Sequence, residues 1–363
     1  MSLEQLRKRL TAVDRELVEL IAERQRIVAE VSAHKLETGT PTRDFERERE
    51  VLQGARQRAM DLGLDPGVAE GIMRALIRSS LTHQEQTRVA AESSGAGRSA
   101  LVIGGAGKMG RWMADFLASQ GFGVEIADPA PAEGPYPQIA DWRESALAQD
   151  IIVIAAPIKA TAGVLEALAE RRPRGLILDI GSLKTPLQRG LGALAGVGCR
   201  VTSIHPMFGP DTRLLSGRHV VFVDVGVADA TEEARSLFAS TMAERIDMSL
   251  EEHDRLIAYV LGLSHAVNLV FFTALAGSGE LVPKLKRLSS TTFDAQLGVA
   301  HQVASDNPHL YFEIQAMNEF GRRSLDALVE AARRVHDLVD QNDEEGFVAL
   351  MESGRRYLEP QDG

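Results

Sequence analysis

The sequence has little cysteine, few aromatic residues and no long apolar run. Its single cysteine, Cys199, excludes an intrachain disulfide and favours a reducing compartment. We predict that Cys199 is a small buried hydrophobic residue and not a nucleophile. No uninterrupted apolar stretch approaches the roughly 18 residues of a membrane span, and the N-terminus has no apolar signal segment. We therefore predict a cytoplasmic protein without a membrane partner.

Positive charge is also scarce. The chain has 40 Lys and Arg against 51 Asp and Glu, a net charge of −11, and this balance disfavours nucleic acid and anionic membrane as partners. Its 44% hydrophobic and 25% charged residues are ordinary for a soluble globular protein, and 363 residues suggest two or three domains. In such an acidic chain, any local group of cations points to an anionic ligand.

The first 92 residues have the pattern of a helical domain. Apolar residues between positions 3 and 31 recur at spacings of three and four, which predicts a long amphipathic helix ending near Thr38–Pro41. A second helix is predicted from Asp44 to about Leu62. Asp65 and Pro66 then form a start signal for a third, which runs towards Arg88. The small residues 92–97 indicate a linker, so the first domain is predicted to span 1–92.

Beyond the linker, short apolar strands alternate with helices. Strands are predicted at 100–103, 124–128, 151–156, 176–180, 201–204 and 220–223. This alternation predicts an α/β doubly wound (Rossmann) domain with a parallel sheet over residues 98–246. Residues 247–363 are helical again and form a C-terminal all-α domain, in which the apolar stretch 256–275 is predicted to be a fully buried helix. The fold class is thus all-α, then α/β, then all-α.

A glycine turn, Gly104-Gly105-Ala106-Gly107-Lys108-Met109-Gly110, lies between the first of these strands and a helix. In this context the motif predicts dinucleotide binding, because glycines let the backbone approach a pyrophosphate at the helix N-terminus. The residues expected to contact the cofactor are Gly105, Gly107, Lys108, Met109 and Gly110. Asp128 ends the next strand and would accept from ribose hydroxyls, which favours NAD over NADP unless Arg111 overrides it.

Several polar residues of the helical domain share faces. Arg24 falls on the apolar series of the first helix, Lys35 lies three turns later on the same face, and Arg7 is rotated by about a quarter turn. Further polar residues follow at helical spacings: Asp44, Arg47 and Glu48, then Ser80 and Gln84. Together they suggest a pocket for a small dianion. Without a nucleophile or metal set, such a pocket suits a reaction driven by positioning and electrostatics.

This set of residues resembles the all-helical class of chorismate mutase, whose pattern is Arg…Arg…Lys, then Asp-x-x-Arg-Glu, then Ser-x-x-x-Gln. The resemblance implies an intertwined dimer in which Arg7 reaches into the site of the second protomer. It also implies that Arg24 and Lys35 hold the substrate carboxylates, and that Lys35 and Gln84 donate to the ether oxygen as the C–O bond breaks. Glu48 would bind the ring hydroxyl. Asp44, Arg47 and Ser80 complete the implied substrate-binding residues.

Three polar signals stand out in the rest of the chain. Ser182 and Lys184 directly follow one strand, and His205 follows another, at the strand ends that line the ligand crevice of a doubly wound sheet. Two prolines and a glycine fix the backbone around His205, and a histidine near neutrality can act on a hydroxyl proton. The third signal is Ser264-His265, within the apolar stretch.

Residues 98–363 resemble prephenate dehydrogenase in the glycine turn, in these three signals and in Glu252-His253-Asp254. The resemblance implies oxidative decarboxylation of prephenate to 4-hydroxyphenylpyruvate with NAD, in which His205 withdraws the ring hydroxyl proton. Ser182 would orient His205 and the substrate, and His265 would line the pocket. Lys184 is either a further substrate contact or a surface lysine at the start of the next helix. The order of the two parts resembles bifunctional enzymes of tyrosine synthesis, and implies a homodimer and feedback inhibition by tyrosine.

One position departs from the pattern of the dehydrogenase family. Asp294 stands where relatives have an arginine that binds a substrate carboxylate, and Gln302 stands where some have another arginine. Either a different cation substitutes, or the substrate carries an ammonium group, as arogenate and 4-amino-4-deoxyprephenate do. The cations that could substitute are Lys286, Arg287 and Arg322.

Two other functions compete with this one. A 3-hydroxyacid dehydrogenase shares the glycine turn, but it needs a lysine one turn after Asn268, where this chain has Phe272. Alternatively, the helical domain is only a regulatory or dimerising module that senses an aromatic metabolite. Turnover of chorismate separates an active mutase from such a sensor.

Overall fold

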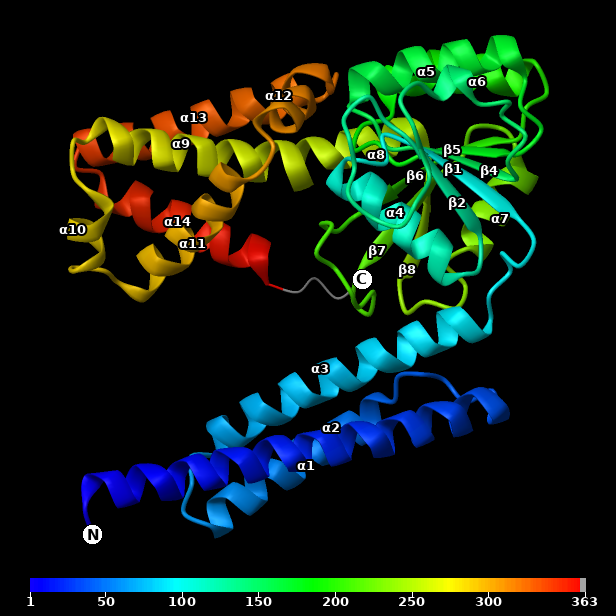
Figure 1. Cartoon of the computed structure of the whole chain (residues 1–363). Helices are drawn as coiled ribbons and strands as arrows, with labels where there is room; N and C mark the ends of the chain where they lie inside the picture. Colours follow the sequence, from blue (N-terminus) through cyan, green and yellow to red (C-terminus); the bar gives the residue numbers. More distant parts are fainter. Residues whose placement is uncertain (360–363) are drawn as a thin grey trace. The chain divides into compact units, whose positions relative to one another are not determined.

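Two units account for residues 1–359, which are the residues that the computed structural model describes (Figure 1). The first unit comprises 1–156, 163–181 and 190–248, so it contains both the N-terminal helices and the sheet. The second comprises 157–162, 182–189 and the chain from Ser249 onwards. The division into 1–92, 98–246 and 247–363 remains a prediction.

Three helices form the N-terminal part, and they begin and end at the expected signals. They are α1 (Leu3–Thr38), α2 (Phe45–Asp61) and α3 (Pro66–Ala91). Gly39 ends α1 in the left-handed conformation (φ 67°), which a glycine adopts without strain. The side chains of Asp44 and Asp65 cap α2 and α3 by accepting backbone N–H bonds. In Figure 1 the three helices run beside one another.

The apolar row of α1 is open to solvent in the single chain. Leu10, Leu17 and Leu20 are 62%, 53% and 60% exposed. A helix whose apolar stripe meets no other element leaves a surface that usually marks an interaction site. The row that predicted an amphipathic helix is therefore confirmed as a helix face, but α2 and α3 do not cover it.

The sheet has eight strands in the order β3-β2-β1-β4-β5-β6-β7-β8. Their bounds are β1 Ser99–Ile103, β2 Gly123–Ala127, β3 Gln138–Ile139, β4 Ile151–Ile154, β5 Leu176–Asp179, β6 Val201–Pro206, β7 His219–Val223 and β8 Glu244–Met248. Strands β1 to β6 pair in parallel, as expected. β7 pairs antiparallel to β6, so the expectation of a wholly parallel sheet was wrong there. Short β3 and the mostly polar β8 were not predicted.

Helices cover both faces of this sheet (Figure 1). They are α4 (Lys108–Ser119), α5 (Ile158–Arg171), α6 (Gln188–Gly196) and α7 (Ala228–Ser236). α4 and α7 share one core with alternate strand residues, where the rings of Phe116 and Phe238 stack at 4.8 Å. Cys199 is buried, as predicted for a structural cysteine. The order of connection reverses between β1 and β4, which is where doubly wound sheets bind ligands.

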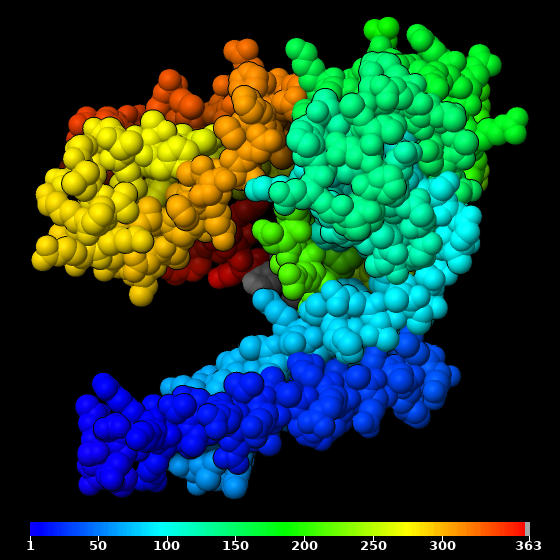
Figure 2. Space-filling model, viewed as in Figure 1, coloured from blue at the N-terminus to red at the C-terminus, as the bar shows by residue number. Residues whose placement is uncertain are grey.

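The second unit is mainly helical. Its elements are α8 (Leu250–Ile257), a π-helical turn (Ala258–Leu263), α9 (Ser264–Gly277), α10 (Val282–Lys286), α11 (Thr291–Ser305), α12 (Pro308–Met317), α13 (Gly321–Asp340) and α14 (Glu344–Leu358). The stretch 256–275 is helical throughout, as predicted, with the π-helical turn between α8 and α9. The expectation of full burial was wrong, because Val260 and Val270 are 55% and 57% exposed. Figure 2 shows part of this yellow segment at the surface.

By length and apolar content alone, Leu250–Gly277 would suffice to cross a membrane. Its first turns, however, carry His253 and Asp254, which are 1% and 0% exposed and hydrogen-bonded to each other. Ionisable groups buried as a pair are accommodated in a protein interior and are expensive in lipid. The composition of this stretch is therefore weak evidence for a membrane span.

Candidate active sites

The helical domain contains a cavity between α1, the turn after it and α3. Its lining residues are Ser32, Lys35, Leu36, Gly39, Thr40, Thr42, Gln84, Arg88 and Glu92. Two predicted residues, Lys35 and Gln84, thus meet at one site although 49 positions separate them in the chain. The Lys35 ammonium donates to the Thr42 carbonyl oxygen at 2.7 Å. Gln84 is buried, and its Oε1, a hydrogen-bond acceptor, has no partner within residues 1–359; a flip of the amide would place the donating Nε2 at the same position.

Arg88 belongs to the same cavity, and sequence reasoning missed it. It lies one helical turn after Gln84 on α3, so the i, i+4 spacing was a signal that could have identified it. Its guanidinium donates to the Thr42 hydroxyl at 3.3 Å and to Glu92 at 2.9 Å. The cavity therefore combines an ammonium and a guanidinium, which suits a dianionic ligand.

Two further predicted residues join α1 to α3. The Arg24 guanidinium donates to the Ser80 hydroxyl at 2.6 Å and to the Leu76 carbonyl oxygen at 3.2 Å. Ser80 is 5% exposed, so this contact fixes the arginine from the protein interior. The interaction keeps the cation of α1 against the helix that carries Gln84.

The remaining predicted residues of this domain are differently placed. Glu48 forms a two-pronged ion pair with Arg43, at 2.8 and 3.0 Å, and Arg43 was not predicted. Asp44 caps α2 by accepting from the backbone N–H of Arg47 at 2.9 Å. The Arg47 side chain is exposed and pairs with Glu50, while Arg7 is exposed on α1. Their roles in a site stay predictions.

The glycine turn has the close backbone contacts that its sequence predicts. Gly104 has φ 87°, and a Cβ there would lie 2.7 Å from the backbone of Ala155. A Cβ on Gly110 would lie 2.1 Å from the Gly104 carbonyl oxygen, so α4 approaches the turn as closely as glycine allows. Gly107 precedes α4 without a side-chain cap, which leaves the helix N-terminus available to a phosphate group.

Asp128 lies beside this turn, directly after β2. One carboxylate oxygen accepts from the Ala106 N–H at 3.1 Å, and the other accepts from the Ala130 N–H at 2.9 Å. These two bonds hold the acid at the position where a ribose would bind. The residues of the turn therefore fit an adenine dinucleotide with free ribose hydroxyls.

Arg111, which could have favoured a 2′-phosphate, is engaged elsewhere. Its guanidinium stacks over Tyr136 at 4.9 Å and donates to the Glu133 carbonyl oxygen at 2.6 Å. Burial, together with the hydrogen bond to Asp115, raises the pKa of Tyr136 to about 12, so the phenol stays protonated. These contacts support NAD over NADP.

His205 lies near the end of β6 in the first unit. It is 5% exposed, and its backbone is in register with Val221 of β7. The next residues form the 207–218 loop, which leads to β7 and is tied to α4 by a bond from the Trp112 indole N–H to the Thr212 carbonyl oxygen at 2.9 Å. The strand was predicted to end at Ile204 with His205 after it, but β6 extends to Pro206 and includes His205 as its last residue but one. The shielded imidazole still lies near the C-terminal end of the strand.

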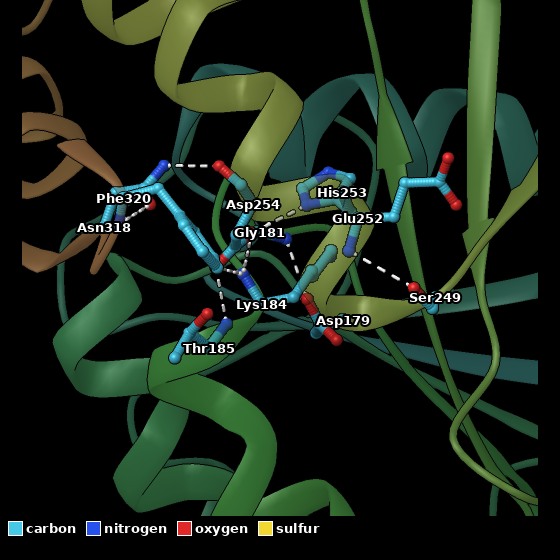
Figure 3. A network of polar contacts seen from close by, with 10 residues as sticks. All are labelled: Asp179, Gly181, Lys184, Thr185, Ser249, Glu252, His253, Asp254, Asn318 and Phe320. Atoms are coloured by element: carbon cyan, nitrogen blue, oxygen red, sulfur yellow. Dashed lines mark hydrogen bonds and ion pairs between the residues drawn. The ribbon is translucent and has the colours of Figure 1, made fainter. Parts of the chain in front are cut away.

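In the second unit, Asp254 organises the segment that contains Lys184 (Figure 3). Its carboxylate accepts from the backbone N–H of Lys184 at 2.9 and 3.1 Å and of Thr185 at 2.7 Å, and contacts the ring of His253 at 2.7 Å. Burial alone would raise the pKa of Asp254, but these hydrogen bonds lower it overall. Lys184 is fully buried, so it is not a surface lysine at the start of a helix.

Comparison with known families covers both parts of the chain. Residues 6–85 match the family "Chorismate mutase type II". Residues 136–246 match "Prephenate dehydrogenase, nucleotide-binding domain", and 249–353 match "Prephenate dehydrogenase, dimerization domain". The chain joins a chorismate mutase to a prephenate dehydrogenase. Both resemblances found in the sequence are confirmed.

Two known relatives align with both parts of the chain. The chain is 28% identical to the T-protein of Enterobacter agglomerans over 95% of its own length and 90% of that protein. It is 26% identical to the T-protein of Haemophilus influenzae, over 98% and 92% respectively. The structure of A. aeolicus prephenate dehydrogenase with hydroxyphenyl propionate and NAD⁺ superposes with a TM-score of 0.55. At 17% identity, over 74% of this chain and 99% of that one, this likeness shows the fold.

Within the prephenate dehydrogenase part, His265 packs its ring on Tyr311 at 4.0 Å. Burial lowers the pKa of His265, so its ring is neutral at neutral pH. Its Nδ1 is buried and has no hydrogen-bond partner in the described part of the chain. A neutral histidine with one unused nitrogen beside an aromatic ring is suited to line a pocket for a ring-shaped substrate.

Two dehydrogenase positions carry less structural support. Ser182 is half-buried and belongs to the second unit, whereas His205 belongs to the first, so their pairing stays a prediction. Asp294 is exposed near the start of α11, where it accepts from the Ser289 hydroxyl at 2.6 Å. The role of this acid in substrate binding stays a prediction.

Proposed function

We propose that the chain catalyses two consecutive reactions of tyrosine biosynthesis. The mutase part rearranges chorismate to prephenate, and the dehydrogenase part oxidatively decarboxylates prephenate to 4-hydroxyphenylpyruvate with NAD. The observation that carries this proposal is the cavity that brings Lys35 and Gln84 together in the same chain as the glycine turn and His205. The relatives named T-protein, which align over nearly the whole chain, support it.

The mutase reaction needs only positioning and charge. Chorismate has two carboxylates, for which Lys35 and Arg24 supply cations on α1, one held by Thr42 and the other by Ser80. As the ether bond breaks, negative charge develops on its oxygen, and donors already in place stabilise it without reorganising. Lys35 and the buried amide of Gln84 are these donors.

The dehydrogenase reaction adds a proton acceptor to a cofactor site. Gly105, Gly107, Lys108, Met109, Gly110 and Asp128 would hold NAD, whose nicotinamide accepts the hydride. His205 takes the proton of the ring hydroxyl, while the same carbon gives up the hydride and the ring carboxylate leaves as carbon dioxide. By the resemblance to prephenate dehydrogenase, Ser182 would orient His205 and the substrate. Neutral His265 lines the pocket with Lys184 as a further contact.

We also propose a homodimer in the cytoplasm. The apolar row of α1 and the exposed valines around the π-helical turn are two separate surfaces that one chain leaves open. The match of residues 249–353 to a dimerization domain supports pairing through the second of them. Pairing through α1 would bring Arg7 to the mutase cavity of the other protomer.

Two variants test the proposal. His205→Asn should lower the prephenate-dependent reduction of NAD by several orders of magnitude and leave chorismate turnover unchanged, whereas Lys35→Ala should do the reverse. Stopped assays with chorismate, and NADH absorbance with prephenate and with arogenate in parallel, measure both activities. Retention of the dehydrogenase rate in His205→Asn would overturn the role of His205, and faster turnover of arogenate would assign the Asp294 end to an ammonium group.

A further inference from the structure

The loop that follows His205 contacts the mutase part of the same unit. Three hydrogen bonds define these contacts of the 207–218 loop and its neighbourhood. The Arg43 guanidinium donates to the Ser216 hydroxyl at 2.6 Å, and the Leu215 N–H donates to the Glu85 carboxylate at 2.7 Å. The other carboxylate oxygen of Glu85 accepts from the Met242 N–H at 2.5 Å. Residues of the dehydrogenase therefore reach the two segments that carry Glu48 and Gln84.

Arg43 stands between these two parts. Its guanidinium makes two parallel bonds to Glu48, at 2.8 and 3.0 Å, and uses a further N–H for Ser216. The side chains of Arg43 and Glu48 are 31% and 20% exposed, so the pair is largely shielded from water. A planar fork that is bonded on both sides has one orientation, and it sets the orientation of the carboxylate that it binds.

The residue before Arg43 extends this effect to the cavity. Thr42 accepts the Lys35 ammonium at its carbonyl oxygen, and its hydroxyl accepts from Arg88. Thr42 is 7% exposed and lines the cavity. Anchoring Arg43 therefore fixes the short turn between α1 and α2. The Thr42 carbonyl oxygen in this turn holds the Lys35 ammonium in position.

Glu85 supplies a second anchor on the opposite side. It follows Gln84 on α3 and is 3% exposed, and both of its carboxylate oxygens accept from backbone N–H groups of the dehydrogenase part. The 207–218 loop is thus held against α3 while Ser216 holds Arg43. The loop thus contacts residues next to both Thr42 and Gln84, which line the mutase cavity.

We infer that Arg43 is a positioning residue of the mutase site, and that the dehydrogenase part holds it in place through Ser216. The inference rests on the proposed mutase activity. It concerns a contact in which the hydroxyl of one part of the chain acts on the chemistry of the other. Arg43 acts through Glu48 and Thr42 and does not itself touch the substrate.

The test uses Ser216→Ala and Ser216→Thr in the full chain. Losing a hydrogen bond to a charged group should reduce kcat/KM of the mutase by roughly threefold to tenfold, since the group acts at one remove from the substrate. Ser216→Thr keeps the hydroxyl and should restore the wild-type value. Arg43→Lys keeps the charge without the fork and should lose about tenfold or more.

Arg56→Lys is the matched control. Arg56 on α2 also pairs with a glutamate, Glu70 on α3, but this pair is separate from the bonds to the 207–218 loop. It should leave the mutase unchanged. Dehydrogenase kinetics and the unfolding temperature are measured for every variant. A mutase loss in Ser216→Ala that Thr reverses, with both other readouts unchanged, supports the inference. Wild-type mutase kinetics in Ser216→Ala, or equal losses in both activities, overturn it. A wild-type chain without mutase activity instead contradicts the proposed function.

Discussion

At Gly110 the backbone of α4 passes so close to the glycine turn that a side chain has no room. Gly110→Ala would place a methyl group 2.1 Å from the Gly104 carbonyl oxygen, and the turn must open to accept it. Overpacking of this kind costs about 1–3 kcal/mol, so the dissociation constant for NAD should rise roughly tenfold or more. Isothermal titration with NAD measures it, and mutase activity should not change.

Gly192→Ala is the control for this substitution. Gly192 lies within α6, and a Cβ added there would have no other atom within 4 Å, so alanine should stabilise the helix slightly and leave NAD binding intact. Equal NAD affinity in Gly110→Ala and wild type would show that the turn does not hold the cofactor.

Single residues also show how far the sequence could be interpreted. Gly104, Gly110 and Asp128 were predictable because a local motif imposes their geometry. Arg43 was not predicted, because it gains its importance from a partner distant in the chain, whereas Arg88 was missed although its helical spacing from Gln84 indicated it. No local pattern distinguishes an arginine that is held by such a partner from one that is merely solvated.

At the level of elements, α8 fixes the segment around Lys184 through one buried carboxylate. The hydrogen bonds to Asp254 lower its pKa below the ordinary 3.8, so the folded state binds this proton more weakly than the unfolded state. The resulting stabilisation is fully present above the unfolded pKa and is lost as the pH falls through the folded pKa. We therefore expect the free energy of unfolding to fall as the pH drops below 3.8, the ordinary pKa of an aspartate.

Urea unfolding followed by circular dichroism across the acid range measures this dependence. Asp254→Asn should lower the free energy of unfolding at neutral pH, because the amide cannot accept the same set of bonds. It should also reduce the fall of that free energy at acid pH, which is called the acid limb below. Glu280→Gln, which removes an exposed ion pair with Lys284, serves as the control and should leave the acid limb in place. An acid limb that Asp254→Asn leaves unaltered would contradict this account.

Elements also differ in how well the sequence predicted them. The N-terminal helices begin and end where caps, proline and glycine indicated, because these signals act within one turn. The stretch 256–275 was predicted to be fully buried, yet apolar periodicity does not reveal whether a face meets its own chain or another. The antiparallel β7 was hidden for a related reason, since strand direction depends on a connection and not on the strand residues.

For the whole molecule, the open row on α1 leads to a test of assembly. If Arg7 completes the mutase site of a second protomer, Arg7→Ala and Lys35→Ala each remove that activity alone. Random mixing makes half of the dimers mixed, and each of these has one intact site, so the mixture should recover about a quarter of the wild-type rate. Mutase assays after co-refolding measure it. No recovery in dimers shown to be mixed would place Arg7 in its own protomer's site.

Because Cys199 is the only cysteine of the sequence and is buried, mixed dimers can be followed with fluorescent labels on an introduced cysteine. Burial raises the pKa of this thiol, so it reacts slowly with maleimide dyes near neutral pH. A cysteine introduced at an exposed position such as Glu232 on α7 would then be the preferred attachment point for a fluorophore. Two differently coloured populations would report the exchange of protomers through energy transfer, without first having to strip other thiols from the chain.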